Sequence, residues 1–239
     1  MLGWRIAHRL ARLVRGGPAL PELADIEAHF AATSAEMPLS HCLFCVMDTE
    51  LTGLDRRTDE IVSIGAVRVR GLGIGVEDCF HTCVRHERLS KTSILIHRLT
   101  PEELDAAPRL PEALARLIGF LGRSVIVGHN VGLDMGFLDQ ACRERFGSPL
   151  PNPRVDTVAL AQAFELERPA DYYERFREDA DFSLAGLAER YNLPGFPEHH
   201  ALYDALQTAY LFLFLVKKLR GGRLATLKDL LRAARGKRL

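Results

Sequence analysis

The stretch FCVMDTELTGLD, residues 44–55, joins an apolar run to two carboxylates. The four residues before Asp48 are apolar, as in a buried strand. Residues i and i+2 of a strand point to the same side, so Asp48 and Glu50 face one way at its end. A divalent cation would cancel their repulsion, because Mg²⁺ takes one or two carboxylates and completes its shell with water and phosphate. Two solvated acids at a strand end are the alternative, which this stretch alone does not exclude.

The neighbouring sequence predicts a sheet. Strands are expected over about 42–49, 60–69 and 76–84, and their short connections favour an antiparallel meander. Another short buried strand is expected at 124–128. Since helical repeats alternate with strands from there on, the sequence predicts an α/β fold with a mixed sheet.

In the second half of the chain, apolar residues recur mostly at helical spacing. One helix is expected to start at Pro101, because proline suits the first helical position, and another to close at Gly147. Other helical segments are LPEALARLIGFLG (110–122), VDTVALAQAF (155–164, a helix or a strand–helix pair), SLAGLAERYNL (183–193) and ALYDALQTAYLFLFLVKKL (201–219).

Charge and composition divide the chain into three parts. We expect a helical N-terminal extension over 1–40, a main domain over 41–220 and a basic helical tail over 221–239. Residues 1–16 carry four arginines, and residues 217–239 carry nine Lys/Arg and one Asp; since the total is zero, the middle carries −12. The basic ends could hold a polyanion or be solvated helical faces, and the N-terminal WRIAHRLARLV could lie on an anionic membrane surface.

The cysteines and apolar runs indicate the compartment. The five cysteines are odd in number and lack the spacing of a disulfide scaffold, which favours a reducing, cytoplasmic setting. The longest apolar run, AYLFLFLV (209–216), is far shorter than the ~20 residues that span a bilayer. We therefore expect no stable membrane insertion.

Two later segments carry further acids. In GHNVGLDMGFL (128–138), a helix is expected to begin near Asn130, which would share a helical face with Asp134. The alternative is a helix cap followed by a surface acid. In EHHALYDALQTAYLF (198–212), Asp204 lies on an otherwise apolar helix, where an acid is costly unless it is paired or metal-bound.

Two histidines precede Asp204. A histidine beside a metal can take a proton from water at neutral pH. His200 is one helical turn before Asp204, whereas His199 is five residues before it and is expected in the preceding loop. Spacing does not choose between them, and either could be a surface residue.

Together these motifs are far more specific than any one of them. From about Leu43 to Leu219 the chain resembles the DnaQ-like, DEDDh-type 3′–5′ exonucleases, which include the proofreading subunits of bacterial DNA polymerase. The matching stretches are MDTELTGLD, DEIVSIGAVRV, SILIHRLTPEEL, GHNVGLDMGFL, RVDTVALAQ and HHALYDALQTA.

The resemblance implies a ribonuclease-H-like fold, a mixed five-stranded sheet flanked by helices. It implies that two Mg²⁺ or Mn²⁺ ions are bound by Asp48, Glu50, Asp134 and Asp204, and it selects His199 as the general base. The expected reaction is removal of nucleoside 5′-monophosphates from single-stranded DNA 3′ ends. The residues expected to contact the substrate are Thr49, Leu51, Thr52, Asn130 and Phe137.

Three positions depart from the family pattern. Leu51, Arg98 and Leu133 replace a threonine, a glycine and a phenylalanine, which affects substrate preference more than metal binding. An RNA 3′–5′ exonuclease is therefore an alternative, and so is a non-catalytic docking module. A polymerase or repair complex is the expected partner besides nucleic acid.

Overall fold

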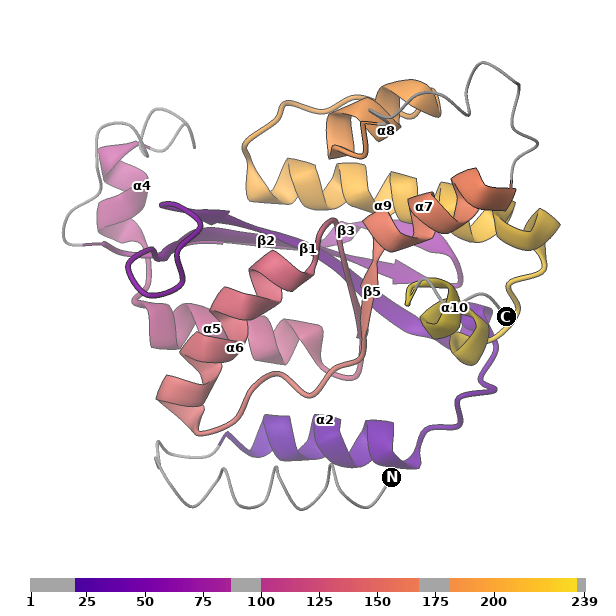
Figure 1. The fold of residues 1–239 in the computed structure, drawn as a ribbon. Coiled ribbons are helices and arrows are strands. Elements are labelled where there is room, and N and C mark those ends of the chain that lie inside the picture. The colour runs from indigo at the N-terminus through magenta and orange to yellow at the C-terminus, as the bar shows by residue number, and fades with distance from the viewer. Residues whose placement is uncertain (1–19, 87–99, 168–180, 236–239) are drawn as a thin grey trace.

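The protein, described as a computed structural model over residues 20–86, 100–167 and 181–235, is built on one sheet (Figure 1). The order is β3-β2-β1-β4-β5, with β2 antiparallel to β1 and β3, and with β4 parallel to β1 and β5. The mixed five-stranded sheet is therefore confirmed. The strands are β1 (Leu43–Leu51), β2 (Ile61–Arg70), β3 (Gly73–Cys83), β4 (Val125–Gly128) and β5 (Arg154–Asp156).

Helices cover both faces of the sheet (Figure 1). One core lies under α7 (Thr157–Glu167), α9 (Ala201–Lys218) and α10 (Leu227–Ala233). The other lies under α2 (Pro21–Ala32), α5 (Leu110–Leu121) and α6 (Gly132–Phe146). The remaining elements are α4 (Pro101–Ala106), α8 (Leu184–Arg190) and the 3₁₀ turns η1 (Leu39–His41) and η3 (Leu219–Gly222).

Strand β1 is apolar without interruption because it lies at the centre of the sheet. Phe44 and Val46 point into the core under α9, whereas Cys45 and Met47 point into the core under α5 and α6. A strand that is covered on both faces needs apolar residues at every position. The apolar run ends at the partly exposed Asp48, and the next two residues, Thr49 and Glu50, are polar but only 8% exposed each.

The described parts of both predicted terminal segments pack on these cores. Leu23 and Ile26 of α2 are 2% exposed, and Leu230 of α10 is fully buried. The segments also meet, since the Leu227 N–H donates to the carbonyl of Met37 at 2.9 Å. The three-part division of the chain stays a prediction, and the predicted helix in WRIAHRLARLV lies outside the described residues.

The predicted strand and helix ends need small corrections. β1 extends to Leu51, so Glu50 lies within the strand, and β3 begins at Gly73. For residues 155–164, the sequence predicted either a helix or a strand–helix pair. The structure has the strand–helix pair, β5 followed by α7. In the parts of the chain that the structure describes, no helix combines the length and apolarity needed to cross a bilayer.

Candidate active site

The first two acids lie at the carboxyl end of β1. Asp48 is partly exposed and Glu50 is 8% exposed. A bulge in the pairing with β2 follows at Glu50/Leu51. The two side chains point to the same side of the strand, as their spacing predicts.

Helix α9 approaches this strand end because a glycine leaves room for it. Gly65 on β2 is the direct partner of Asp48 in the sheet. A Cβ atom on Gly65 would lie 2.2 Å from the Ala201 carbonyl carbon, so the first turn of α9 packs against the bare backbone. Asp204 belongs to that turn and accepts a hydrogen bond from the His200 N–H at 3.2 Å.

Three carboxylates meet as a result. One oxygen from each of Asp48, Glu50 and Asp204 lies within 4.8 Å of the others. These donors fit Mg²⁺ or Mn²⁺, because such ions prefer oxygen ligands.

Asp134 is held behind this group. It is 5% exposed, in the first turn of α6. Its Oδ1 accepts hydrogen bonds from the N–H and hydroxyl of Thr49, at 3.0 and 2.6 Å. Among the described residues, the group of acids within 4.8 Å of one another does not include Asp134. The structure thus brings together three of the four predicted metal ligands and places the fourth on β1 through Thr49.

The three clustered carboxyls are hard to ionise together. Burial raises the pKa of Asp48 well above its usual range, and the charges of Asp134, Glu50 and Asp204 raise it further. Burial, together with Asp204, raises the pKa of Glu50 to about 7. Burial also raises the pKa of Asp204. A cation would remove this penalty, since a nearby positive charge favours the ionised carboxylates.

The structure separates the two histidines. His199 is exposed, has a left-handed backbone (φ 64°), and lowers the pKa of both Glu50 and Asp204 by its charge. The ring of His200 instead stacks on His81, with centroids 4.7 Å apart, and lies 4.5 Å from the Tyr203 ring. His199 is therefore the histidine at the carboxylates, and His200 packs.

The prediction for Asn130 is wrong in one respect. Helix α6 begins at Gly132, and Asn130 precedes it with φ 56°, so it does not share a helical face with Asp134. Asparagine tolerates this left-handed conformation. The Asn130 N–H donates to Asp156 Oδ1 at 3.0 Å, and its carbonyl accepts from the Leu133 N–H at 3.0 Å. Its exposed side chain lies at the end of β4.

The other residues that were predicted to contact the substrate differ in how exposed they are. Thr52 is part of the turn after β1, where its hydroxyl donates to Asp59 Oδ1 at 3.0 Å and accepts from the Glu60 N–H at 3.0 Å. Leu51 is partly buried beside it. Phe137 is 5% exposed and packs in the core under α6, as its helical spacing predicts. Arg98 lies outside the described residues.

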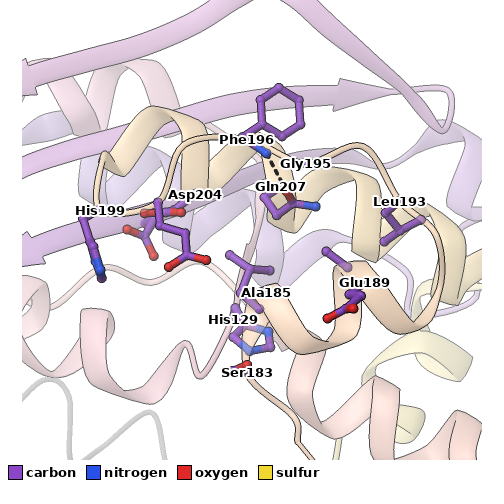
Figure 2. A pocket seen from close by; sticks show the side chains of 14 residues that line it. His129, Ser183, Ala185, Glu189, Leu193, Gly195, Phe196, His199, Asp204 and Gln207 are labelled. Carbon is purple, nitrogen blue, oxygen red and sulfur yellow. Dashed lines mark hydrogen bonds between the residues drawn. The ribbon is translucent and has the colours of Figure 1, made fainter.

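A cavity of about 520 Å³ opens beside Asp48, His199 and Asp204 (Figure 2). Its wall includes residues that the sequence analysis did not single out: His129, Ser183, Leu184, Ala185, Phe196 and Gln207. His129 is braced by Thr157 Oγ1 and the Phe182 carbonyl, both at 2.9 Å. Only its place in the GHN stretch could have indicated it, whereas α8 and the loop before α9 reach the cavity through tertiary packing.

An exposed leucine marks the turn after β1. Leu54 is 75% exposed, in the same TELTGLD stretch that begins with the carboxylates. A single exposed leucine is common on protein surfaces, so Leu54 is only a candidate contact for a ligand.

Known proteins resemble the chain over the segment that contains these residues. The exonuclease family model of the RNase T type matches residues 45–212. A PolC-type DNA polymerase III of Thermotoga maritima is 33% identical over 199 residues, covering 83% of this chain and 14% of that protein. The chain thus spans about one seventh of the length of this relative.

Solved structures share the fold. Exonuclease I of E. coli in complex with a dT13 oligonucleotide aligns with a TM-score of 0.60 at 20% identity, over 75% of this chain and 42% of that one. The zinc-bound complex of the same enzyme with single-stranded DNA aligns with a TM-score of 0.61 at 20% identity, over 76% and 41%. From the family model and the relatives together, the chain belongs to the DnaQ-like exonuclease family.

Proposed function

We propose that this chain is a metal-dependent 3′–5′ exonuclease that hydrolyses single-stranded DNA to nucleoside 5′-monophosphates. The observation that carries the proposal is the meeting of Asp48, Glu50 and Asp204 within 4.8 Å. A family of nucleases and a set of oxygen donors of this kind point to the same chemistry.

Each of the chain's own residues has a role in the proposed reaction. Asp48, Glu50 and Asp204 would hold two Mg²⁺ or Mn²⁺ ions, and Asp134, which accepts hydrogen bonds from Thr49, would assist them. When bound, the metal ions supply a water of lowered pKa and stabilise the charge on the phosphate. A ring nitrogen of His199 accepts the proton of the attacking water. The water oxygen bonds to phosphorus, the bond from phosphorus to the 3′ oxygen breaks, and that oxygen takes a proton from solvent to become the 3′ hydroxyl of the shortened strand.

The turn after β1 would hold the terminal nucleotide. The backbone over Thr49–Thr52 borders the carboxylates, and the exposed Leu54 offers an apolar surface to a base. Asn130 is exposed at the neighbouring strand end and can reach the sugar or phosphate. Phe137 supports this region from within α6. Such contacts recognise the 3′ end and the sugar–phosphate backbone of the strand. The preference for particular bases should therefore be weak.

DNA is favoured over RNA by the comparisons. The PolC relatives are DNA polymerases, and a solved neighbour holds a DNA oligonucleotide. By the same reasoning we propose a polymerase or repair complex as partner and the cytoplasm as the compartment; the free thiols of the described residues are consistent with that setting. An RNA substrate or a docking role is the alternative.

The test is digestion of 5′-labelled DNA and RNA 12-mers in Mg²⁺, Mn²⁺ or EDTA. The proposal expects a ladder that shortens one nucleotide at a time from the 3′ end of DNA, only with metal. Immediate release of labelled mononucleotide would show attack from the 5′ end and contradict it. Faster cleavage of RNA would favour the alternative substrate, and no cleavage of either would favour docking.

A further inference from the structure

A second groove, of about 890 Å³, is lined by segments that adjoin the elements carrying the carboxylates. The turn after β1, the end of β3, the start of α5 and one side of α6 line it. Its wall includes Ile61, which pairs with Leu51 in the sheet, and Phe137, three residues after Asp134. Three residues of helix rise about 4.5 Å, so the groove begins about one helical turn from the acids of the site.

Five arginines line this groove from four separate parts of the chain. They are Arg56, Arg57, Arg85, Arg109 and Arg145, all exposed. Arg85 donates to the carbonyl of Asp105. Within residues 20–86, 100–167 and 181–235, no carboxylate forms an ion pair with any of the five.

The same wall holds three acids, each with a hydrogen-bond partner, which leaves the groove with more guanidinium groups than carboxylates. Asp59 accepts from Thr52 and from the Asp55 N–H at 2.9 Å. Glu60 contacts His86 Nδ1 at 2.9 Å, and Glu144 accepts from Gln140 Nε2 at 3.1 Å. The groove therefore presents five guanidinium groups and three acids that already have partners. This positive surface lies in the middle part of the chain, which is acidic as a whole.

The side chain of Arg56 packs where Gly136 of α6 has no side chain. A Cβ atom on Gly136 would lie 2.6 Å from Cζ of Arg56, so the guanidinium lies across the bare helix backbone. Glycine is disfavoured inside a helix. This packing fixes a positive charge beside the turn of α6 that follows Asp134.

We propose that this arginine groove binds the phosphodiester backbone of the substrate strand on the 5′ side of the bond that is cleaved. The inference rests on the proposed function, because it assumes a strand whose 3′ end lies at the carboxylates. Guanidinium groups pair with phosphate through two parallel hydrogen bonds. Two apolar residues between them, Leu110 and Pro111, offer surface to sugars and bases.

Binding of a 5′-fluorescein dT12 strand in EDTA, measured by anisotropy over a range of salt, tests the groove without catalysis. Arg57→Gln and Arg145→Gln should each raise the Kd several-fold. Each lost phosphate contact should reduce the slope of log K against log salt by about 0.7. The control is Arg123→Gln, an exposed arginine beyond the end of α5 that lies away from the groove, where it pairs with Asp25 at 2.9 Å.

Hydrolysis in Mg²⁺ gives a second readout. The same two variants should lower kcat/KM for dT12 and leave it unchanged for the dinucleotide dTpdT, whose single phosphate is the one that is cleaved. An unchanged Kd and salt slope, or an equal loss in the Arg123→Gln variant, would overturn the proposal. Arginine-dependent binding of a poly-glutamate peptide but not of dT12 would overturn it as well. Arginine-dependent binding without any cleavage would instead refute the exonuclease function and leave the groove standing.

Discussion

Thr49 donates two hydrogen bonds to one oxygen of Asp134, from its backbone N–H at 3.0 Å and from its hydroxyl at 2.6 Å. The pair joins β1 to α6 between Asp48 and Glu50, across 85 residues of sequence. Both bonds lower the pKa of Asp134, against the burial that raises it. Thr49 thus both orients this carboxylate and helps it to ionise.

Replacing Thr49 with valine keeps the shape and removes the hydroxyl donor. We expect kcat to fall by about ten-fold, as for the loss of other outer partners of metal-site groups. The thermal midpoint should change little, because the backbone bond remains. Thr58→Val, on an exposed threonine of the turn after β1, is the matched control. Wild-type kcat in the Thr49 variant would show that Asp134 needs no such support.

Glu50 makes the metal-free protein sensitive to pH. Its pKa is raised from 4.5 to about 7, so between these values the folded state binds more protons than the unfolded state. Stability therefore falls as pH rises through this window, and the loss is complete above about 7. In EDTA, the thermal midpoint of the wild type should fall between pH 5 and pH 8 by more than that of Glu50→Gln.

Added Mg²⁺ should reverse this loss in the wild type, and more at pH 8 than at pH 5, because the ion binds the ionised carboxylates. The Glu50→Gln variant should respond less to the ion. Glu77→Gln, which removes an exposed acid of β3, should behave as the wild type does. A wild-type midpoint that rises from pH 5 to pH 8 relative to Glu50→Gln would contradict the assignment.

Gly65 should be indispensable for the approach of α9. A methyl group there meets the Ala201 backbone, so Gly65→Ala should destabilise the fold by about 1–3 kcal/mol and separate Asp204 from β1. Urea unfolding and nuclease rate should both report it. Gly119→Ala in α5 is the control: no atom lies within 4 Å of its added Cβ, so stability should rise by up to about 1 kcal/mol. Equal behaviour of the two variants would refute the close packing.

Substitution of His199 should affect catalysis, whereas substitution of His200 should affect stability. His199→Gln should lower kcat by about 10²-fold or more, the usual contribution of a general base, with an unchanged thermal midpoint. His200→Gln should lower the midpoint, because its ring stacks on His81 and Tyr203. If His200→Gln lost more kcat at full stability, the roles would be exchanged.

The sequence alone was sufficient to predict the strand at the centre of the sheet. The apolar run before Asp48 follows from a strand that is covered on both faces. β5 has only three residues, Arg154–Asp156, too few to show a period, and so it could not be separated from the helix after it. The start of α6 was misplaced because Asn130 adopts a left-handed turn that no hydrophobic repeat records.

For the site, the spacing of Asp48 and Glu50 was informative because a strand has a fixed period. The placement of Asp134 on Thr49, and of Asp204 over Gly65, depends on packing between segments far apart in sequence. The arginine groove could not be predicted from the sequence either. Its five arginines come from separate parts of a chain whose middle is acidic, and only the fold brings them together.

The most direct test of the central claim is the anomalous signal of Mn²⁺ in crystals of the full chain. The account predicts a peak bound by oxygens of Asp48, Glu50 and Asp204, which the Asp48→Asn variant loses together with its nuclease activity. A protein that degrades DNA in Mn²⁺ while its crystals show no peak at these three carboxylates would contradict it.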